Sequence, residues 1–387
     1  MAFSKIGAYQ YYTSIGDTET ASKYSSTDAY GTINNPMVIR NIYEFSNTSM
    51  DDINKDEFYM IMVDDINMDD YPELDKLYSN PFQNAIVIES YGKSVHIDFN
   101  GYCIRNLLVR NFTFNTQSKY AFIKFYVKGY ENVTLYLDNV RIENFVISNF
   151  TTTTTTSIDY SLFWNTAGNI VINNMYVSIY HNRDKSLAIQ DRYNMFSLCI
   201  PVNGYTTKIF NLYTKFSGNI NKATRYGGNN NSLLYIHNKM KIYDWTIDFR
   251  DFYWIDIYPS GDDNLLYNDS ANIDTVHIVG KLNYTRSNSS GNGKQKRCVS
   301  ILGGSTVTNV LCDAEINHVN KESSDNISSY YLYDIVTAFN SSSSFINKDK
   351  VKFSESYSKI GDSIKCTTEQ LKDPAFLTQN GLVFMQT

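Results

Sequence analysis

The chain has 387 residues, of which 34 are basic and 40 are acidic, so its net charge is −6. This balance leaves no basic stripe for a phosphate backbone, and we do not expect nucleic-acid binding. No run of about 18 apolar residues is present, and the first residues lack the apolar core of a secretion signal, so we expect no membrane insertion.

Two features of the composition narrow the class further. The five cysteines are odd in number and unrelated in spacing, which favours reduced, buried thiols over a disulfide framework. The chain holds 32 Tyr and 22 Phe, but only 19% of its residues are charged. Tyrosine can pack its ring and still offer a hydroxyl, so the sequence predicts an aromatic surface suited to proteins or sugars.

The N-terminal part divides into two segments. Residues 1–30 show neither helical nor strand periodicity, and we interpret them as an arm or anchor that cannot build a core alone. Residues 31–62 begin with a turn cluster and continue with Asn41 and Glu44 at capping-box spacing. The sequence predicts that a short helix there forms an N-terminal cap over the first coil.

A pattern of six residues then repeats along the chain: apolar, any, Asn or Asp, apolar, any, apolar. Neighbouring copies are 31 to 38 residues apart, which is typical of solenoids and other repeat architectures. The third position forms a column of Asp65, Gly101, Asn139, Asn174, Asn211, Asp244, Thr275 and Asn309.

The chemistry of the pattern favours strands. Apolar residues two apart have the period of a strand, and Asn, Asp and Gly most readily adopt the left-handed backbone of a corner. A further apolar run precedes most corners, at residues 85–89, 120–126, 161–164, 196–200, 233–236, 265–267 and 298–302. The sequence therefore predicts an all-β, right-handed parallel β-helix of about eight coils over residues 63–340, with a β-propeller as the alternative.

This fold predicts the orientation of individual side chains. Ile142, Val177, Ile247 and Ile278 should face inward, and Asn139, Asn174, Asn211 and Asn309 should stack at one edge. Residues 341–387 form a closing segment, in which Thr367 and Gln370 again have capping-box spacing before a short helix and a last strand at 382–385.

The stretch 250–263 is the candidate binding loop. Its aromatic residues, Phe252, Tyr253, Trp254 and Tyr258, could stack on the apolar faces of sugars while nearby Asp and Asn accept sugar hydroxyls. The alternative is that alternating residues of the stretch, Phe252 with Trp254 or Tyr253 with Ile255, pack back onto the coil or into another subunit.

Catalytic signals are weak. Asp248, Asp251 and Asp256 form the best cluster of carboxylates for sugar cleavage, but acidic residues in loops are usually only solvated. The five histidines lie in separate coils without metal-ligand spacing, and neither a nucleophile elbow nor a phosphate-binding glycine loop is present. We expect no cofactor, no metal and no enzyme activity.

Several stretches together resemble the β-helical spike and fibre proteins of tailed bacteriophages. They are the start of the cap at 31–36, the run 56–67, the Asn-cornered coils and the ending from Thr368 to Leu382. The richness in Asn, Ile, Lys and Tyr is similar to that of phages with AT-rich genomes, such as crAss-like phages. The resemblance covers residues 31–387 as a pattern, without a diagnostic motif.

The resemblance implies a homotrimer in the virion, assembled in the bacterial cytoplasm and joined to other virion proteins through residues 1–30. It implies a body that faces host-surface polysaccharide, as a head fibre or a tail fibre. Many members of this family cut polysaccharides, so a depolymerase, either a glycoside hydrolase or a lyase, is the alternative function.

Overall fold

The computed structural model of the chain describes residues 5–46, 56–71, 86–109, 119–128, 132–148, 158–183, 194–222, 234–256, 263–268, 271–286, 299–304, 307–320, 336–338, 343–353, 364–380 and 382. The statements below concern these residues.

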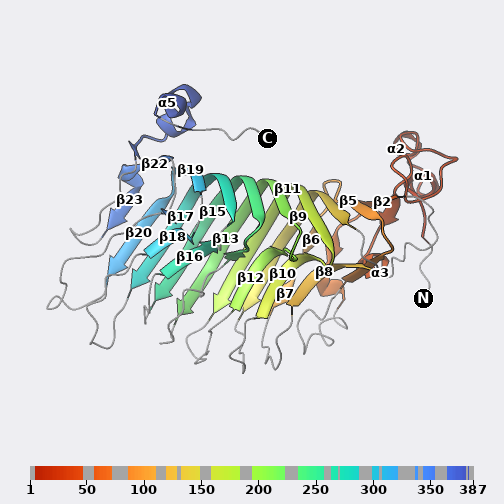
Figure 1. The fold of residues 1–387 in the computed structure, drawn as a ribbon, viewed down its shortest axis with the longest axis horizontal. Helices are drawn as coiled ribbons and strands as arrows, with labels where there is room; N and C mark the ends of the chain where they lie inside the picture. Colours follow the sequence, from red (N-terminus) through yellow and green to blue (C-terminus); the bar gives the residue numbers. More distant parts are fainter. Residues whose placement is uncertain are drawn as a thin grey trace.

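One long sheet forms the body of the molecule, and its strands stack side by side along the long axis (Figure 1). The pairings within it are parallel, and each strand pairs with its counterpart in the next coil. The main path is β1 (Met37–Ile39), β2 (Glu57–Met62), β5 (Ser94–Asp98), β9 (Val133–Ser148), β11 (Gly168–Arg183), β13 (Thr207–Lys222), β15 (Met240–Asp256), β17 (Asn272–Arg286), β19 (Val307–Cys312), β22 (Ser343–Ile346) and β24 (Ile364–Lys365). Short strands join it at β3 (Ile66–Asn67), β6 (Ile104–Arg105), β7 (Leu108–Val109), β20 (Glu315–Asn320) and β23 (Val351–Phe353).

Two smaller parallel sheets supply the remaining strand of each coil. They contain β4 (Ile86–Ser90), β8 (Lys119–Val127), β10 (Ile158–Asn165) and β12 (Asn194–Ile200), and then β14 (Leu234–Ile236), β16 (Asp263–Asn268), β18 (Val299–Gly304) and β21 (Val336–Ala338). Each of the seven apolar runs predicted upstream of a corner coincides with one of these strands, so that prediction is confirmed.

The fold is thus a parallel β-helix, as predicted, and the parallel stacking of successive strands excludes the blades of a propeller. The predicted number of coils needs correction. The regular section is made by five strands of 15 to 17 residues, β9, β11, β13, β15 and β17, and covers only about four turns. Toward both ends the coils are built from shorter strands, and the parallel stack extends from β1 to β24, beyond the predicted limits 63–340.

The register of the long strands confirms six positions of the predicted corner column. Asn139, Asn174, Asn211, Asp244, Thr275 and Asn309 occupy the same place in successive coils. Asn139, Asn174 and Asn211 have positive φ, between 54° and 57°, as the prediction requires, whereas Asp244, Thr275 and Asn309 do not. Gly101, in the coil before that of Asn139, also has positive φ, of 83°, so the left-handed corner runs from Gly101 to Asn211 and is absent from the last three positions of the column.

The interior is filled by apolar side chains on the inward positions of every coil. Ile142, Val177, Ile247 and Ile278 are 0% exposed, which confirms their predicted orientation. They belong to one apolar cluster that runs through the solenoid. Four of the cysteines, Cys103, Cys199, Cys312 and Cys366, are buried free thiols, as expected, and Cys298 lies outside the described residues.

The N-terminal segment folds back onto the first strands. Helices α1 (Ala8–Ser14) and α2 (Thr18–Ala21) form a small apolar cluster with Val38, Ile61 and Val63 on the outer side of β1 and β2. The predicted cap helix is α3 (Ile42–Ser46), whose Asn41 Oδ1 accepts hydrogen bonds from the backbone N–H groups of Tyr43 and Glu44, 3.1 Å away.

The C-terminal segment packs on the outer side of the last strands. The predicted capping box is present, because Thr367 and Gln370 exchange hydrogen bonds of 2.9 and 3.2 Å. The 3-10 helix η3 (Gln370–Lys372) and helix α5 (Pro374–Gln379) follow, and their Leu371 and Leu377 pack with Leu311 and Phe345. Of the predicted last strand at 382–385, only Leu382 lies within the described residues.

Candidate binding surface

The outward positions beside the corner form rows along the solenoid. In the repeated pattern, the apolar positions point into the core, so the residues between them point outward. The row before the corner contains Asp138, Asn173, Phe210 and Tyr243, and the row after it contains Arg141, Tyr176, Tyr213 and Thr246. The corner column separates the two rows.

A ladder of side-chain amides joins the corners. Asn174 Nδ2 donates to Asn139 Oδ1 over 3.2 Å, and Asn211 Nδ2 donates to Asn174 Oδ1 over 2.9 Å. Asn139 in turn donates to the carboxylate of Asp98 over 3.0 Å. The amide dipoles therefore point the same way along three coils, and the ladder holds the rows at a fixed spacing.

The row after the corner is a stack of rings and a cation. The guanidinium carbon of Arg141 lies 5.6 Å from the centre of the Tyr176 ring, and Tyr176 stacks on Tyr213 with 5.4 Å between ring centroids. The carboxylate of Glu143 accepts a 2.7 Å hydrogen bond from Arg141 Nε, which orients the guanidinium. Arg141, Tyr176 and Tyr213 thus belong to three consecutive coils.

A buried carboxylate ends this stack. Asp248 lies two residues after Thr246, and its side chain is only 3% exposed. Its Oδ2 accepts a hydrogen bond from the Tyr213 hydroxyl and another, of 2.9 Å, from Arg250 Nε. Burial and the hydrogen bond with Asp248 raise the pKa of Tyr213 to about 12, so this hydroxyl keeps its proton at neutral pH.

The row before the corner carries the closest aromatic pair. Phe210 and Tyr243 stack with ring centroids 4.4 Å apart and an interplanar angle of 7°. Two residues earlier on the same outer face, Lys208 and Lys241 are partners in the register of β13 and β15. In the described part of the chain, neither lysine forms an ion pair.

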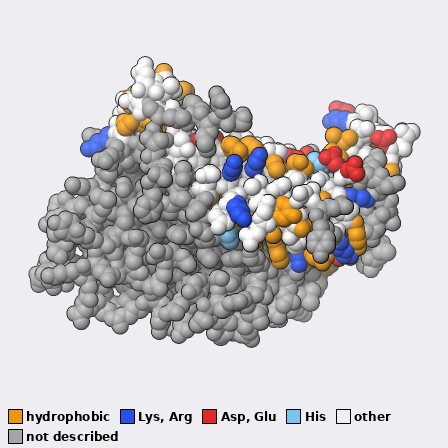
Figure 2. Space-filling model, in the orientation of Figure 1, with side chains coloured by type: hydrophobic (Ala, Val, Ile, Leu, Met, Phe, Trp, Pro, Cys, Tyr) orange, Lys and Arg blue, Asp and Glu red, His pale blue; other side chains and the backbone are white. Residues whose placement is uncertain are grey.

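Figure 2 shows basic and hydrophobic side chains next to one another along the upper edge of the molecule. The outline of that edge is lowered between two raised ends, which are α1 with α2 and α5 in Figure 1. In the register, Ile61 pairs with Asp98 and Asp98 pairs with Asp138, so Ile61 lies in line with the row before the corner. Ile61 packs under α1 and α2. The N-terminal helices therefore cover the beginning of this row.

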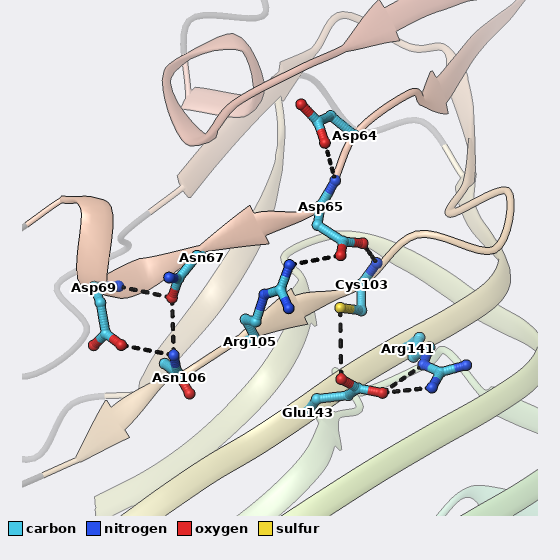
Figure 3. A network of polar contacts seen from close by, with 9 residues as sticks. All are labelled: Asp64, Asp65, Asn67, Asp69, Cys103, Arg105, Asn106, Arg141 and Glu143. Atoms are coloured by element: carbon cyan, nitrogen blue, oxygen red, sulfur yellow. Dashed lines mark hydrogen bonds and ion pairs between the residues drawn. The ribbon is translucent and has the colours of Figure 1, made fainter.

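Polar contacts beside the corner join the first coils (Figure 3). Arg105 Nη2 lies 2.6 Å from Asp65 Oδ2, and Asn106 Nδ2 donates to Asn67 and Asp69 over 2.9 and 2.6 Å. These pairs join residues about one coil apart and link the coil of β3 to that of β6, while Cys103 Sγ, 3.8 Å from Glu143 Oε2, extends the network to β9. The carboxylates in it are engaged by neighbouring donors, as in a structural network.

A second aromatic stack lies further from the corner in the same coils. The His96 ring lies between Tyr59 and Tyr136, 4.3 Å from each ring centroid. Its Nε2 is 3.5 Å from Glu57 Oε1. Burial lowers the pKa of His96, and the nearby Glu57 carboxylate opposes this effect only in part.

The three candidate catalytic aspartates do not share one environment. Asp248 is the buried carboxylate described above, whereas the Asp251 side chain is 70% exposed and lies 3.6 Å from Lys281 Nζ. Asp251 occupies a left-handed corner with φ of 48°, where β15 has one residue more than β13 and β17. Asp256 is the last residue of β15, and its side chain lies outside the described part.

The aromatic binding stretch requires a correction. Phe252 is 0% exposed and Trp254 is 4% exposed, so both rings pack into the core and cannot offer a face to a ligand. They belong to strand β15, where alternate residues point inward. Tyr253, between them, is 49% exposed and keeps its predicted accessibility, while Tyr258 lies outside the described residues.

Among the described residues, no group of three or more His, Cys, Asp or Glu side chains could hold a metal ion. None of the helices described is both long and apolar enough to cross a membrane. Comparison of the chain with protein-family models, with curated proteins and with solved structures found no match.

The aromatic surface residues outside the predicted binding stretch occupy fixed positions in the repeated pattern. Phe210 and Tyr243 precede the corner residue, and Tyr176 and Tyr213 follow two places after it. The register alone could have identified them, because positions flanked by inward apolar residues must point outward. The predicted binding residues were assigned to a loop between coils, whereas these four rings lie on strands.

Proposed function

We propose that this chain is a structural protein of a tailed-bacteriophage virion, displayed on the head or the tail as an elongated fibre or spike that contacts host-surface polysaccharide. The resemblance of the Asn-cornered coils to such proteins supports this proposal, and so does the parallel β-helical body. Within the proposal the chain is a homotrimer assembled in the bacterial cytoplasm, and its N-terminal segment joins other virion proteins.

The observation that carries the glycan contact is the pair of aromatic stacks on either side of one corner. Tyr176 with Tyr213 and Phe210 with Tyr243 stack ring against ring across adjacent coils of a scaffold whose spacing is about 4.8 Å, so the outer edges of the rings form an apolar surface. Aromatic rings present large apolar area with few rotatable bonds, so a ligand that packs against them costs little ordering of the protein. The amide ladder between the stacks holds them in register.

A binding assay on bacterial cells tests this contact. The labelled full-length chain should adsorb to capsulated cells of a susceptible strain and adsorb less after the capsule is removed. A Tyr176→Ala, Tyr243→Ala variant should lose most of this adsorption. The matched control is Tyr126→Ala, because Tyr126 is 38% exposed on β8, which belongs to another sheet. Equal adsorption of both variants and the parent would remove the stacks from the contact.

Two further measurements test the rest of the proposal. Light scattering of the purified chain should give the mass of three copies, and a stable monomer at micromolar concentration would contradict the fibre. Incubation with capsular polysaccharide should leave the polymer intact. New reducing ends or unsaturated sugars would replace the binding role with that of a depolymerase, and Asp248 and Asp251 would be the first residues to change.

A further inference from the structure

The outer face of β13 and β15 before the corner combines aromatic rings with two lysines that form no ion pair with any residue the structure describes. We infer that this patch, Lys208, Phe210, Lys241 and Tyr243, binds an acidic saccharide, meaning a sugar chain with carboxylate groups. This inference rests on the proposed function, since it names the class of glycan that the solenoid would contact.

The positive charge is the first argument. Lys208 and Lys241 are direct register partners on neighbouring strands, and like charges in such positions repel each other. Neither has an ion-pair partner among the described residues. A third ammonium group, that of Lys239, donates a 3.3 Å hydrogen bond to the neutral Asn203 Oδ1. A ligand carboxylate placed between the ammonium groups of Lys208 and Lys241 would relieve their repulsion.

The rings supply the second argument. Phe210 and Tyr243 are half-buried and stacked at 4.4 Å, and they lie two residues from the lysines on the same face. A sugar ring packed against the outer edges of these two rings would bring its carboxylate within reach of the flexible lysine side chains. Apolar contact and charge complementarity would thus act on one sugar unit.

The neighbouring coils limit the positive patch to these two strands. The register partner of Lys208 on β11 is Val171, and the register partner of Lys241 on β17 is Asn272, so neither neighbouring strand adds a positive charge at this position. In the row of the rings, Asp138 lies two coils before Phe210 and its carboxylate accepts a 2.7 Å hydrogen bond from Asn173, while Asp274, beside Tyr243, is 7% exposed. The patch fits one or two acidic sugar units in an otherwise neutral chain better than a nucleic acid, which requires a long basic stripe.

Calorimetric titration of the full-length chain with two synthetic probes tests the inference. The first probe is a hexamer of galacturonic acid, and the second is the same hexamer with its carboxylates methyl-esterified, which keeps the rings and removes the charge. The parent should bind the acid about fivefold or more tightly than the ester, and added salt should weaken the difference.

Variants separate charge from stacking. Lys208→Gln, Lys241→Gln should bind the acid about fivefold more weakly and the ester unchanged, whereas Phe210→Ala, Tyr243→Ala should weaken both probes. The matched control Lys215→Gln, Lys365→Gln removes the same charge from positions outside the patch, one further along β13 and one on β24, and should bind as the parent does. Circular dichroism and thermal melting confirm that each variant is folded.

Three outcomes would overturn the inference: no binding of the acid, equal binding of acid and ester, or equal weakening by the control pair. Tighter binding of a poly-glutamate peptide than of the acidic hexamer would assign the patch to a protein partner instead. The proposed function is judged separately by adsorption to cells. If Lys208→Gln, Lys241→Gln still adsorbs while Tyr176→Ala, Tyr243→Ala does not, the glycan is neutral and only the inference about its charge fails.

Discussion

Asn174 donates a hydrogen bond from Nδ2 to Oδ1 of Asn139 in the preceding coil, and both residues have left-handed backbone with φ of 57° and 54°. One side chain therefore does two things: its short amide tolerates the strained corner, and its dipole links one coil to the next. A residue that lacks either property should weaken the stack.

Replacing Asn174 with Val should lower the free energy of unfolding by about 2 kcal/mol, because a β-branched residue resists the left-handed region and the ladder loses two hydrogen bonds. Asn174→Gly keeps the backbone freedom and loses only the ladder, so it should cost about half as much. Thr246→Val, at an outward position after the corner, should change stability by less than about 0.5 kcal/mol. Urea unfolding followed by circular dichroism measures all three, and equal melting of Asn174→Val and the parent would refute the role of the corner.

The repeat was readable from sequence because each coil faces the same steric problem. An Asn or Gly at the corner between inward apolar residues is the direct solution, so both the column and the inward-facing Ile142 and Val177 could be predicted. Asp244, Thr275 and Asn309 occupy the same column without a left-handed corner. Their backbone depends on neighbouring coils, and a six-residue pattern does not contain that information.

A second corner, further along the long strands, uses glycine. Gly218 has φ of 89°, and a Cβ added to it would lie 2.1 Å from the backbone oxygen of His181. Gly204 has a similar φ of 92°, but an added Cβ would meet nothing within 4 Å. Gly218→Ala should therefore cost about 3 kcal/mol or more, and Gly204→Ala only about 1 kcal/mol from backbone strain. A difference of less than about 0.5 kcal/mol between the two variants would mean that the coils can separate at this point.

Neighbouring aromatic residues of β15 should respond oppositely to truncation. Phe252 is 0% exposed and contacts Phe216 and Phe249, so Phe252→Ala should destabilise the chain by about 3 to 5 kcal/mol. Tyr253 is 49% exposed, and Tyr253→Ala should cost less than about 1 kcal/mol. Thermal unfolding of the pair tests the alternation of β15, and similar losses from both variants would contradict it.

The orientation of the aromatic residues in the stretch 250–263 was only partly predictable, because it depends on where the strand ends. Four aromatic residues in the seven positions 252–258 look like an exposed loop when the end of the strand is unknown. Strand β15 continues to Asp256, and its extra residue at Asp251 shifts which side chains point inward. A bulge of one residue reverses the facing of everything after it, and the composition of the stretch does not reveal it.

The hydroxyl of Tyr213 should matter because its acceptor is buried. Tyr213→Phe leaves Asp248 with one donor fewer in a site where its side chain is 3% exposed, and should cost about 1 to 2 kcal/mol. Tyr243→Phe is the matched control, since this ring stacks on Phe210, and it should cost less than about 0.5 kcal/mol. A double variant with Asp248→Asn should lose less than the sum of the two single changes, because the hydroxyl and the carboxylate interact directly.

The stack of His96 between Tyr59 and Tyr136 should make stability depend on pH. Burial lowers the pKa of His96 in the folded chain below its unfolded value of about 6.5, so the unfolded chain binds a proton more readily. The contribution of neutral His96 is complete above that unfolded value and is lost as the pH falls through the folded pKa. Unfolding in urea should therefore need less denaturant at about pH 5.5 than at about pH 7.5.

Replacing His96 with Gln removes the titrating group and should flatten this pH dependence. His277, whose pKa is also lowered by burial, is unchanged in that variant, so part of the slope should persist. Glu57→Gln provides the opposite change, because loss of the carboxylate 3.5 Å from His96 Nε2 should lower the pKa of His96 further and steepen the dependence. A slope that His96→Gln leaves unchanged would show that other groups control the response to acid.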